Sequence, residues 1–202
     1  MDGAADGRRL GGSMSEAAEP GGRAPAPGEL SVVQDFINSI DREEGTEELD
    51  TTANSSAWLY GHGLTRSRPR LTRGDVDRAR RFRELLRALA LANNGVPIDP
   101  GVIDEANREL AALPLVGRLE EAGAARLEPG GRGVDEALGR IAGIVVAEML
   151  RGRWSRLKAC ARDVCQWVFY DRSRSRTGTW CTMAVCGSRT KMSAYYRRRH
   201  PG

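Results

Sequence analysis

Four cysteines lie close together near the end of the chain, at Cys160, Cys165, Cys181 and Cys186. Their spacing is C-x4-C, fifteen intervening residues, and a second C-x4-C. Each short loop of this kind presents two thiolates to one face of a metal ion, and two such loops complete the tetrahedral geometry of structural zinc. The spacing therefore predicts one structural Zn²⁺ ion held by the four cysteines.

Disulfide bonds and free thiols are the alternatives to metal binding. Arg8 and Arg9 are followed by no apolar h-region, and no apolar run approaches the ~20 residues of a membrane helix. We therefore expect a cytoplasmic protein, in which the reducing environment disfavours disulfides. Four thiolates would leave no open position for a catalytic water. We interpret His62 as a loop residue and His200 as a terminal residue rather than as metal ligands.

The region around the cysteines is strongly basic. From Arg151 onwards 13 Lys and Arg stand against two acids, a net charge of +11, whereas the preceding residues carry 18 basic against 25 acidic residues, a net −7. A basic, metal-stabilised module beside an acidic body favours nucleic-acid binding. The cations expected to contact nucleic acid lie in a turn and a terminal helix: Arg172, Arg174, Arg176, Arg189, Lys191, Arg197, Arg198 and Arg199.

The acidic body is predicted to be helical. Residues 1–28, rich in Gly, Ala, Pro and Arg, predict a disordered segment. Apolar residues at helical spacing predict helices over 31–40 and 51–60, after Thr72, after Asp99, and over 134–150. An acidic connection is expected at 41–49 and a loose hairpin at 115–119 and 125–128. The same spacing puts Arg83, Arg87 and Glu148 on exposed faces and Met149 inward.

The basic module is predicted to contain a hairpin and a helix. Residues 166–171 form a β-rich run, 172–178 a turn region, and 179–182 the return strand. The second cysteine pair leads into a terminal helix over 188–199. Knuckle, hairpin and helix in this order are typical of a treble-clef-like zinc finger. The expected fold class is mainly α: a helical N-terminal domain at 29–151 with a small β-hairpin, followed by the finger at 152–202.

Stretches 160–165, 166–174 (QWVFYDRSR) and 180–189 (WCTMAVCGSR) resemble the CGNR zinc finger of bacteria. In that family the four cysteines bind zinc and the finger binds DNA, and the resemblance implies the same here. The Asn that names the family is replaced by Ser188. Because this residue is not a ligand, we expect zinc binding to survive and a side-chain amide contact to be lost.

Residues 34–39, QDFINS, are similar to the early Asp-Phe-x-Asn-Thr pattern of the ABATE domain, which that family places upstream of the finger. The resemblance implies a mostly helical domain in stress-linked transcription regulation, with a small-molecule effector. Asp35 and Asn38 lie one helical turn apart. We interpret them as satisfying neighbouring backbone groups rather than lining a pocket.

These observations together predict a zinc-dependent DNA-binding transcription regulator whose helical body senses a ligand or a partner. An RNA-binding module and a protein-interaction finger are the alternatives. We expect a homodimer on two half-sites and, when the protein is bound to DNA, a location in the nucleoid. The sequence contains no Gly-rich phosphate loop and no nucleophile with a matching histidine, so we expect no enzymatic activity.

Overall fold

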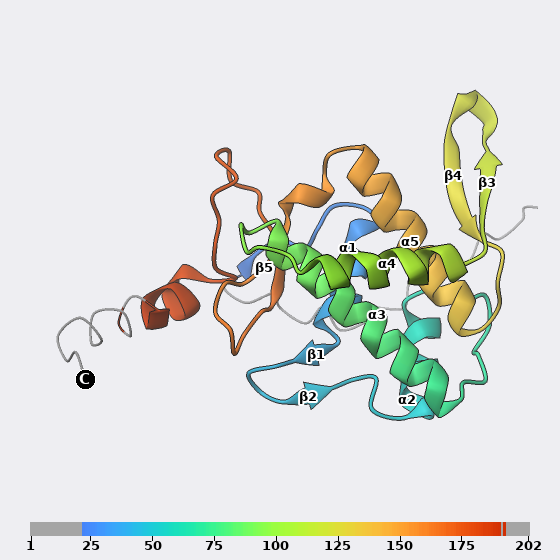
Figure 1. The fold of residues 1–202 in the computed structure, drawn as a ribbon, viewed down its shortest axis with the longest axis horizontal. Coiled ribbons are helices and arrows are strands. Elements are labelled where there is room, and N and C mark those ends of the chain that lie inside the picture. Colours follow the sequence, from blue (N-terminus) through green and yellow to red (C-terminus); the bar gives the residue numbers. More distant parts are fainter. Residues whose placement is uncertain (1–21, 191, 193–202) are drawn as a thin grey trace, which may run out of the picture.

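The computed structural model describes residues 22–190 and 192 and is mainly helical, as the sequence predicts (Figure 1). Small antiparallel hairpins accompany the helices. Among the described helices, none combines the length and the apolar character that a membrane span requires. The elements in chain order are α1 (Leu30–Asn38), β1 (Ile40–Asp41), β2 (Thr46–Glu47), α2 (Thr52–Gly61), α3 (Arg73–Ala92), α4 (Pro100–Ala112), β3 (Leu115–Leu119), β4 (Ala125–Pro129), α5 (Val134–Leu150), β5 (Leu157–Ala159) and β6 (Val168–Tyr170).

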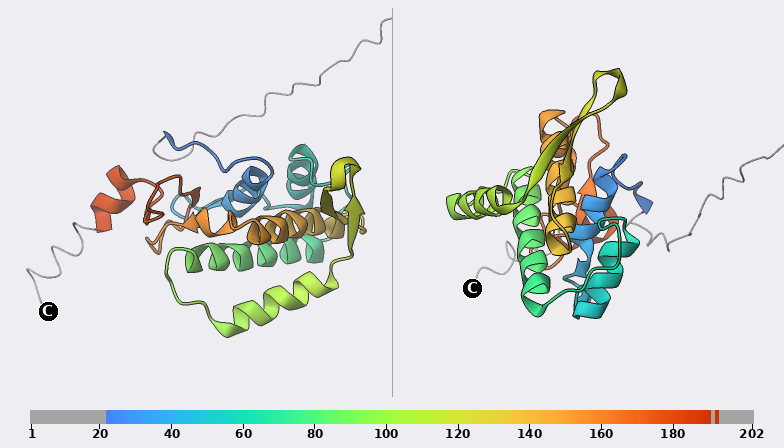
Figure 2. Two further views of the ribbon diagram at one scale, coloured as in Figure 1. Left: turned by 90° about the horizontal axis from the view of Figure 1, so that it is seen from above. Right: turned by 90° about the vertical axis from the view of Figure 1, so that its right-hand side faces the viewer.

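The helices form layers around α5 (Figure 2). Helices α1 and α2 lie on one side of α5, α3 lies on the other, and α4 is outermost. Helix α5 is therefore buried along most of its length, and Ala137, Leu138 and Ile141 are almost inaccessible to water. Helix α4 packs mainly on α3 and contributes no fully buried residue, although its apolar positions are spaced for an inward face.

The predicted helix starts are confirmed by their caps. Thr72 accepts a hydrogen bond from the Asp75 backbone N–H, and Asp75 accepts one from the Thr72 backbone N–H at 2.7 Å. This reciprocal capping box satisfies two donors that the first turn of α3 leaves free. Asp99 caps α4 by accepting a hydrogen bond from the Gly101 N–H at 2.8 Å, with Pro100 at the first helical position.

The predicted loose hairpin is confirmed as β3 and β4, whose tip extends away from the helices (Figure 1). Its β4 strand lies against α5, where the helix carries Gly139 and Gly143. A Cβ atom at Gly143 would lie 2.9 Å from the Leu127 carbonyl oxygen, closer than van der Waals contact allows. The two glycines therefore allow the strand backbone to approach the helix.

The predicted exposure of the α3 arginines is wrong for Arg83 and Arg87, which are 2% and 1% exposed. Arg83 donates two hydrogen bonds of 2.7 Å to Glu47 in the β1–β2 hairpin. Arg87 donates to Glu84 at 3.0 Å and to the Ile37 carbonyl at 2.5 Å. Helical spacing assigns arginine to the polar face, but these long side chains extend into the interface with α1, where carboxylate and carbonyl oxygens satisfy them.

Two assignments at the end of α5 are also wrong. Glu148 is buried. Its carboxylate is covered by two arginines, which donate hydrogen bonds to it: Arg151 at 3.1 Å and Arg153 at 2.5 Å. Met149, expected to face inward, is 40% exposed. The chain turns back directly after the helix, so the arginines that follow reach Glu148, a contact that helical periodicity cannot predict.

The strand pairing of the C-terminal module also differs from expectation. Strand β6 pairs with β5, which precedes the first cysteine, and the return strand predicted at 179–182 is not formed. The first cysteine loop is thus itself the turn of the β5–β6 hairpin. The β5 run, Leu157–Ala159, is only three residues long, too short for its apolar and polar alternation to identify a strand.

The β5–β6 hairpin belongs to the core of the body as much as to the cysteine module. Val168 and Tyr170 pack with the apolar residues of the helical layers, whereas Phe169 packs with the four cysteines. This division follows from the alternation of side chains along a strand. The hairpin therefore contributes to two hydrophobic clusters, one in the body and one around the cysteines.

The segment 22–28, which its composition assigns to a disordered region, is packed against both parts of the molecule. Arg23 donates to the Trp180 and Cys181 carbonyl oxygens at 3.1 and 2.5 Å, and its guanidinium lies 4.7 Å from the centre of the Phe169 ring. Ala26 is buried, and its backbone N–H donates to the Gln34 side chain. The start of the chain before residue 22 lies outside the described residues.

Candidate metal centre

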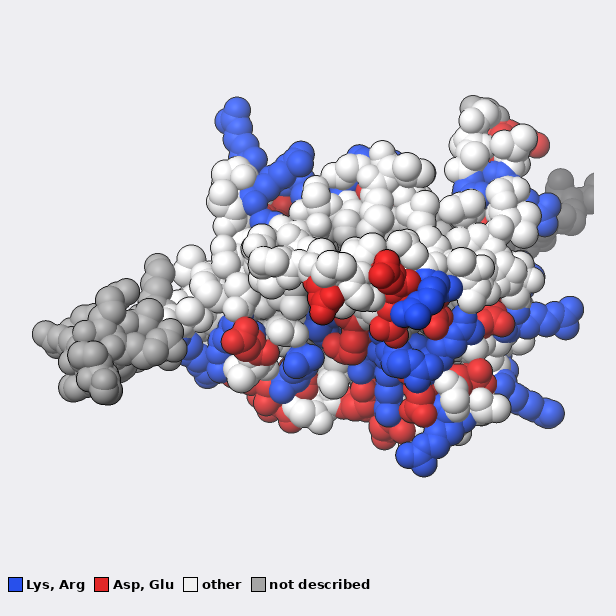
Figure 3. Space-filling model, in the orientation of Figure 1, with Lys and Arg blue, Asp and Glu red and all other residues white. Residues whose placement is uncertain are grey.

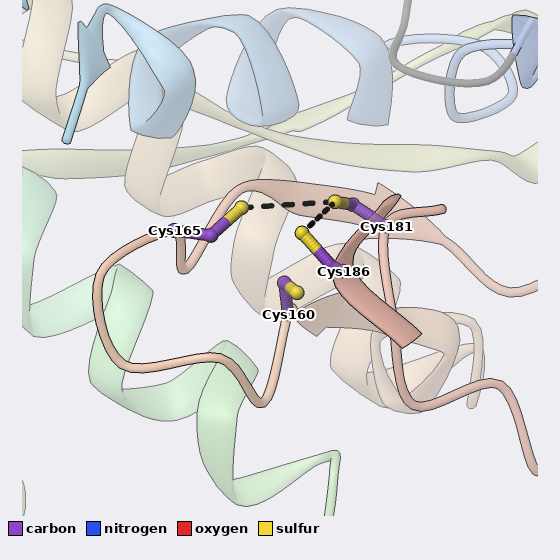
Figure 4. A group of neighbouring side chains, drawn as sticks. All are labelled: Cys160, Cys165, Cys181 and Cys186. Carbon is purple, nitrogen blue, oxygen red and sulfur yellow. Dashed lines mark hydrogen bonds between the residues drawn. The ribbon is translucent and has the colours of Figure 1, made fainter. Parts of the chain in front are cut away.

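The four cysteine sulfurs converge on one buried point, as the spacing predicts (Figure 4). All four Sγ atoms lie within 4.8 Å of one another. The Cys181 Sγ lies 3.7 Å from that of Cys165 and 3.6 Å from that of Cys186. Zn–S bonds of ~2.3 Å in a tetrahedral site separate the sulfurs by about 3.8 Å. The donor set and its dimensions fit one structural zinc ion.

The thiols hydrogen-bond to one another, and these bonds change their pKa values. Hydrogen bonds from Cys165 and Cys181 lower the pKa of Cys160 to about 2. A hydrogen bond with Cys160 raises the pKa of Cys165 to about 12. Hydrogen bonds with Cys160 and Cys165 raise the pKa of Cys181. Without a cation the buried sulfurs therefore retain protons between them. Zinc binds thiolates, so binding must release these protons and becomes weaker at low pH.

Backbone hydrogen bonds shape the loop that carries the first cysteine pair. The Cys160 N–H donates to the Trp167 carbonyl at 2.9 Å, while the N–H groups of Cys165 and Gln166 donate to the Arg162 carbonyl at 2.9 and 3.1 Å. Gln166 adopts a left-handed conformation with φ +47°, which closes the turn. The loop thereby turns both thiols toward the same side.

The second pair is positioned by a short π-helix over Met183–Gly187. Cys181 precedes this turn and Cys186 lies within it. A Cβ atom at Gly187 would lie 3.1 Å from the Trp180 ring, so glycine lets the ring pack beside the last ligand. Ser188, where the CGNR pattern has Asn, donates to the Met183 carbonyl at 3.2 Å. Its hydroxyl thus bonds to the backbone of the ligand-bearing turn.

Side chains of the body hold the module through its backbone. Asn38 donates to the Val168 carbonyl and accepts from the Val168 N–H, both at 2.8 Å, and Gln34 donates to the same carbonyl. The interpretation of Asn38 as a partner for backbone groups is confirmed, but these groups belong to a strand 130 positions away and are not neighbours in the sequence. The polar residues of the QDFINS motif therefore join α1 to the strand beside the metal centre.

Several residues that position the centre were missed in the sequence. At the end of α3, Asn93 donates to the Trp154 and Leu157 carbonyls, and Asn94 to those of Ala159 and Thr179, at 2.8 to 2.9 Å. The pair of asparagines indicated only a helix end. Two adjacent side-chain amides can nevertheless donate hydrogen bonds to a neighbouring strand. The signal that could have predicted this role is the presence of two asparagines side by side at the end of a long helix.

The turn arginines lie on an exposed loop, 171–178, beside the metal centre. Within the described part of the chain, Arg174 and Arg176 make no ion pair, and Arg172 contacts the Pro25 carbonyl and the Tyr170 ring. Arg189 is exposed and pairs with Glu43. The other cations expected to contact nucleic acid lie outside the described residues: Lys191, Arg197, Arg198 and Arg199.

The loop is built on a buried ion pair. Lys158, 4% exposed, donates to Asp171, 1% exposed, at 3.0 Å, and also to the Arg176 and Gly178 carbonyls at 2.6 and 3.1 Å. Asp171 in turn accepts from the backbone N–H groups of Ser173 and Gly178. The pair therefore fixes both ends of the loop, and its arginine side chains project to solvent.

The histidines do not join the cysteine site as far as the structure describes them. His62 stacks on Trp58 with ring centres 3.7 Å apart, and the Trp58 carbonyl lies 2.9 Å from its Nδ1. Over residues 22–190 and 192 the four cysteines form the one group with metal-ligand geometry. His200 lies outside these residues.

Two protein-family models match the chain. Residues 156–199 match the CGNR zinc finger, and residues 30–164 match ABATE, described as "Putative stress-induced transcription regulator". No curated protein matches the sequence. The two matched ranges overlap at 156–164, which contains β5 and most of the first cysteine loop. The overlap coincides with the segment that belongs to both the core of the body and the metal centre.

Proposed function

Because the chain belongs to the ABATE family and carries a CGNR zinc finger downstream, we propose that it is a zinc-dependent regulator that binds DNA through the finger. The observation that carries this proposal is the loop 171–178. Its arginines are exposed, and within the described residues no carboxylate pairs with Arg172, Arg174 or Arg176. Such cations are free to contact phosphates, and arginine can also read guanine with two hydrogen bonds.

The base of the loop supports this assignment. Some body arginines, such as Arg78, Arg83 and Arg126, are neutralised by glutamates or aspartates, whereas Arg68 and Arg70 are exposed and make no ion pair with the described residues. The loop arginines are distinguished by the rigid base that Lys158 and Asp171 form beneath them. Figure 3 displays basic side chains that stand out from the upper edge of the finger. A fixed loop with unpaired cations loses little conformational entropy on binding, which favours a functional contact over a merely solvated charge run.

Zinc supplies folding energy rather than reactivity in this proposal. The ion is held by Cys160, Cys165, Cys181 and Cys186. The loops that carry these cysteines connect the terminal turn to β6. We assign no catalytic role to any residue.

We further propose that the helical body transmits the binding of an effector or a partner to the finger. Asn38, Asn93 and Asn94 hold the finger by its backbone, so a small movement of α1 or α3 would move the metal centre with it. This direct connection, together with the shared core, supports regulation through the body.

Binding of the zinc-loaded protein to a duplex of random sequence across a salt series tests the proposal. A triple variant, Arg172→Gln with Arg174→Gln and Arg176→Gln, should bind more weakly. Each lost phosphate contact reduces the slope of log K against log salt by about 0.9, so the slope should fall by about 2 to 3.

The matched control removes the same charge from the body: Arg68→Gln with Arg70→Gln and Arg73→Gln, three exposed residues before and at the start of α3. Equal losses of affinity in the two triple variants would refute a specific role for the loop. Tighter binding of a structured RNA than of duplex DNA at the same salt concentration would instead identify RNA as the partner.

A further inference from the structure

The tip of the β1–β2 hairpin meets the finger through a single carboxylate. Glu43 Oε2 lies 2.6 Å from Arg162 Nη1 in the first cysteine loop, and Glu43 Oε1 pairs with Arg189 beyond the last cysteine. In Figure 3 acidic and basic atoms meet where the hairpin approaches the finger. One acidic group of the body thus neutralises two arginines of the finger, one in the first cysteine loop and one after the last cysteine.

The hairpin presents Glu43 in a defined position. Asp41 Oδ1 accepts hydrogen bonds from the backbone N–H groups of Glu43 and Glu44 at 2.9 and 3.0 Å, and Gly45 closes the turn with φ +72°. At the base of the hairpin, Glu47 is held by Arg83. The turn is therefore shaped by its own contacts and does not depend on the finger.

The contact itself is accessible to solvent. The side chains of Arg162, Glu43 and Arg189 are 21%, 30% and 56% exposed. Exposed ion pairs contribute little stability and exchange readily with other ions. A competing anion can therefore reach both guanidinium groups without unfolding any element.

Arg162 has a second anchor that does not involve Glu43. Its Nη1 lies 4.0 Å from the Sγ of the ligand Cys186. A zinc ion with four thiolates carries net negative charge, which holds a neighbouring guanidinium in place. The two oxygens of Glu43 meet two arginines in the way that the two free oxygens of a phosphodiester would. The arginines would thus remain available when Glu43 leaves.

We infer that Arg162 and Arg189 form a subsite for a DNA backbone phosphate, and that Glu43 occupies this subsite in the free protein as a built-in competitor. The inference rests on the proposed DNA-binding function and adds Arg162 to the residues that contact DNA. DNA must displace Glu43 before it can use the subsite. The apparent affinity is then reduced by the fraction of molecules in which the subsite is open.

The test compares Glu43→Gln with Glu44→Gln in the full-length, zinc-loaded protein. Both variants lose one negative charge from the same turn, but Glu44 is exposed and makes no ion pair with the described residues. In Glu43→Gln, DNA no longer has to displace the two ion pairs of Glu43. For pairs of ordinary exposed strength, this should raise the DNA affinity roughly three- to tenfold. Glu44→Gln should change the affinity less than about twofold.

A second arm repeats Glu43→Gln in a protein that already carries Arg162→Gln and Arg189→Gln. The gain should disappear there, because nothing remains for Glu43 to block. Equal gains for Glu43→Gln and Glu44→Gln, or a gain that persists without the arginines, would overturn the inference. If the unmodified protein and every variant fail to bind duplex DNA at low salt, the proposed function fails as well, so the two failures are distinguishable.

Discussion

Replacing Lys158 by methionine removes the charge at the base of loop 171–178 while retaining an unbranched side chain of similar length. The ammonium group donates to Asp171 at 3.0 Å and to the Arg176 and Gly178 carbonyls at 2.6 and 3.1 Å. Because both charged groups are almost completely buried, water cannot replace the lost donors without opening the loop.

The expected loss of stability follows from what the substitution leaves behind. Removing one partner of a buried ion pair costs about 3–5 kcal/mol, since the other charge is left without compensation. Asp171 keeps the N–H groups of Ser173 and Gly178 as donors, so we expect a value near the lower end, about 3 kcal/mol.

The pH dependence supplies a second signature. Burial raises the pKa of Asp171, but hydrogen bonds from Ser173, Lys158 and Gly178 outweigh burial and hold this pKa well below its usual range. A depressed carboxyl pKa contributes stability that is present above the unfolded pKa of about 3.9 and is lost as pH falls through the folded pKa. Lys158→Met should therefore flatten the acid limb of the stability curve.

Urea unfolding of the zinc-saturated protein at pH 7 measures the free energy, with the exposed Arg70→Met as the control for losing one positive charge. The same samples should show weaker DNA binding, although Lys158 is itself too buried to touch DNA. A loss below about 1 kcal/mol with unchanged DNA affinity would refute the idea that the buried pair braces the loop.

Three further predictions concern the metal, α5 and α1. Chelation of zinc, or Cys181→Ser, should abolish DNA binding. It should also lower the melting temperature measured from the helical circular-dichroism signal, because residues of the finger belong to the core of the body. An unchanged melting temperature would contradict this. Gly143→Ala should lower the melting temperature by the equivalent of about 1–2 kcal/mol, because the clash with Leu127 outweighs the helix propensity of alanine. The control Gly74→Ala should not destabilise the protein, because the nearest atom to the added Cβ lies 3.7 Å away. Asn38→Ala should cost about 2–3 kcal/mol in urea unfolding, because it leaves the Val168 N–H without its partner, whereas Asn54→Ala, which removes an exposed amide in α2, should cost far less.

Features that depend on a few neighbouring residues could be predicted from the sequence. The caps at Thr72 and Asp99 are local hydrogen bonds, and the spacing of the cysteines reflects the geometry of one ion. The β3–β4 hairpin and the long helix α5 were likewise visible in local patterns.

Contacts between distant residues could not be predicted in this way. Strand β5 is identified only by its partner β6, and Arg87 is buried because α1 and the finger supply acceptors on both sides. The contact of Glu43 with Arg162 spans 119 positions, so no local pattern contains it. The opposite charges of body and finger indicated that the two could meet, but only the fold specifies which residues do.

The bond between Asn38 and Val168 joins positions 130 residues apart, and it has a consequence for the order of events during protein synthesis. Ribosomes add about 5–20 residues per second, so α1 emerges roughly 6 to 26 s before the strand that completes its surroundings. During that interval the apolar side of α1 lacks the strand that completes its packing in the folded protein. The body can therefore complete its fold only after the finger has also left the ribosome, and the four cysteines become able to bind zinc together at that same late stage.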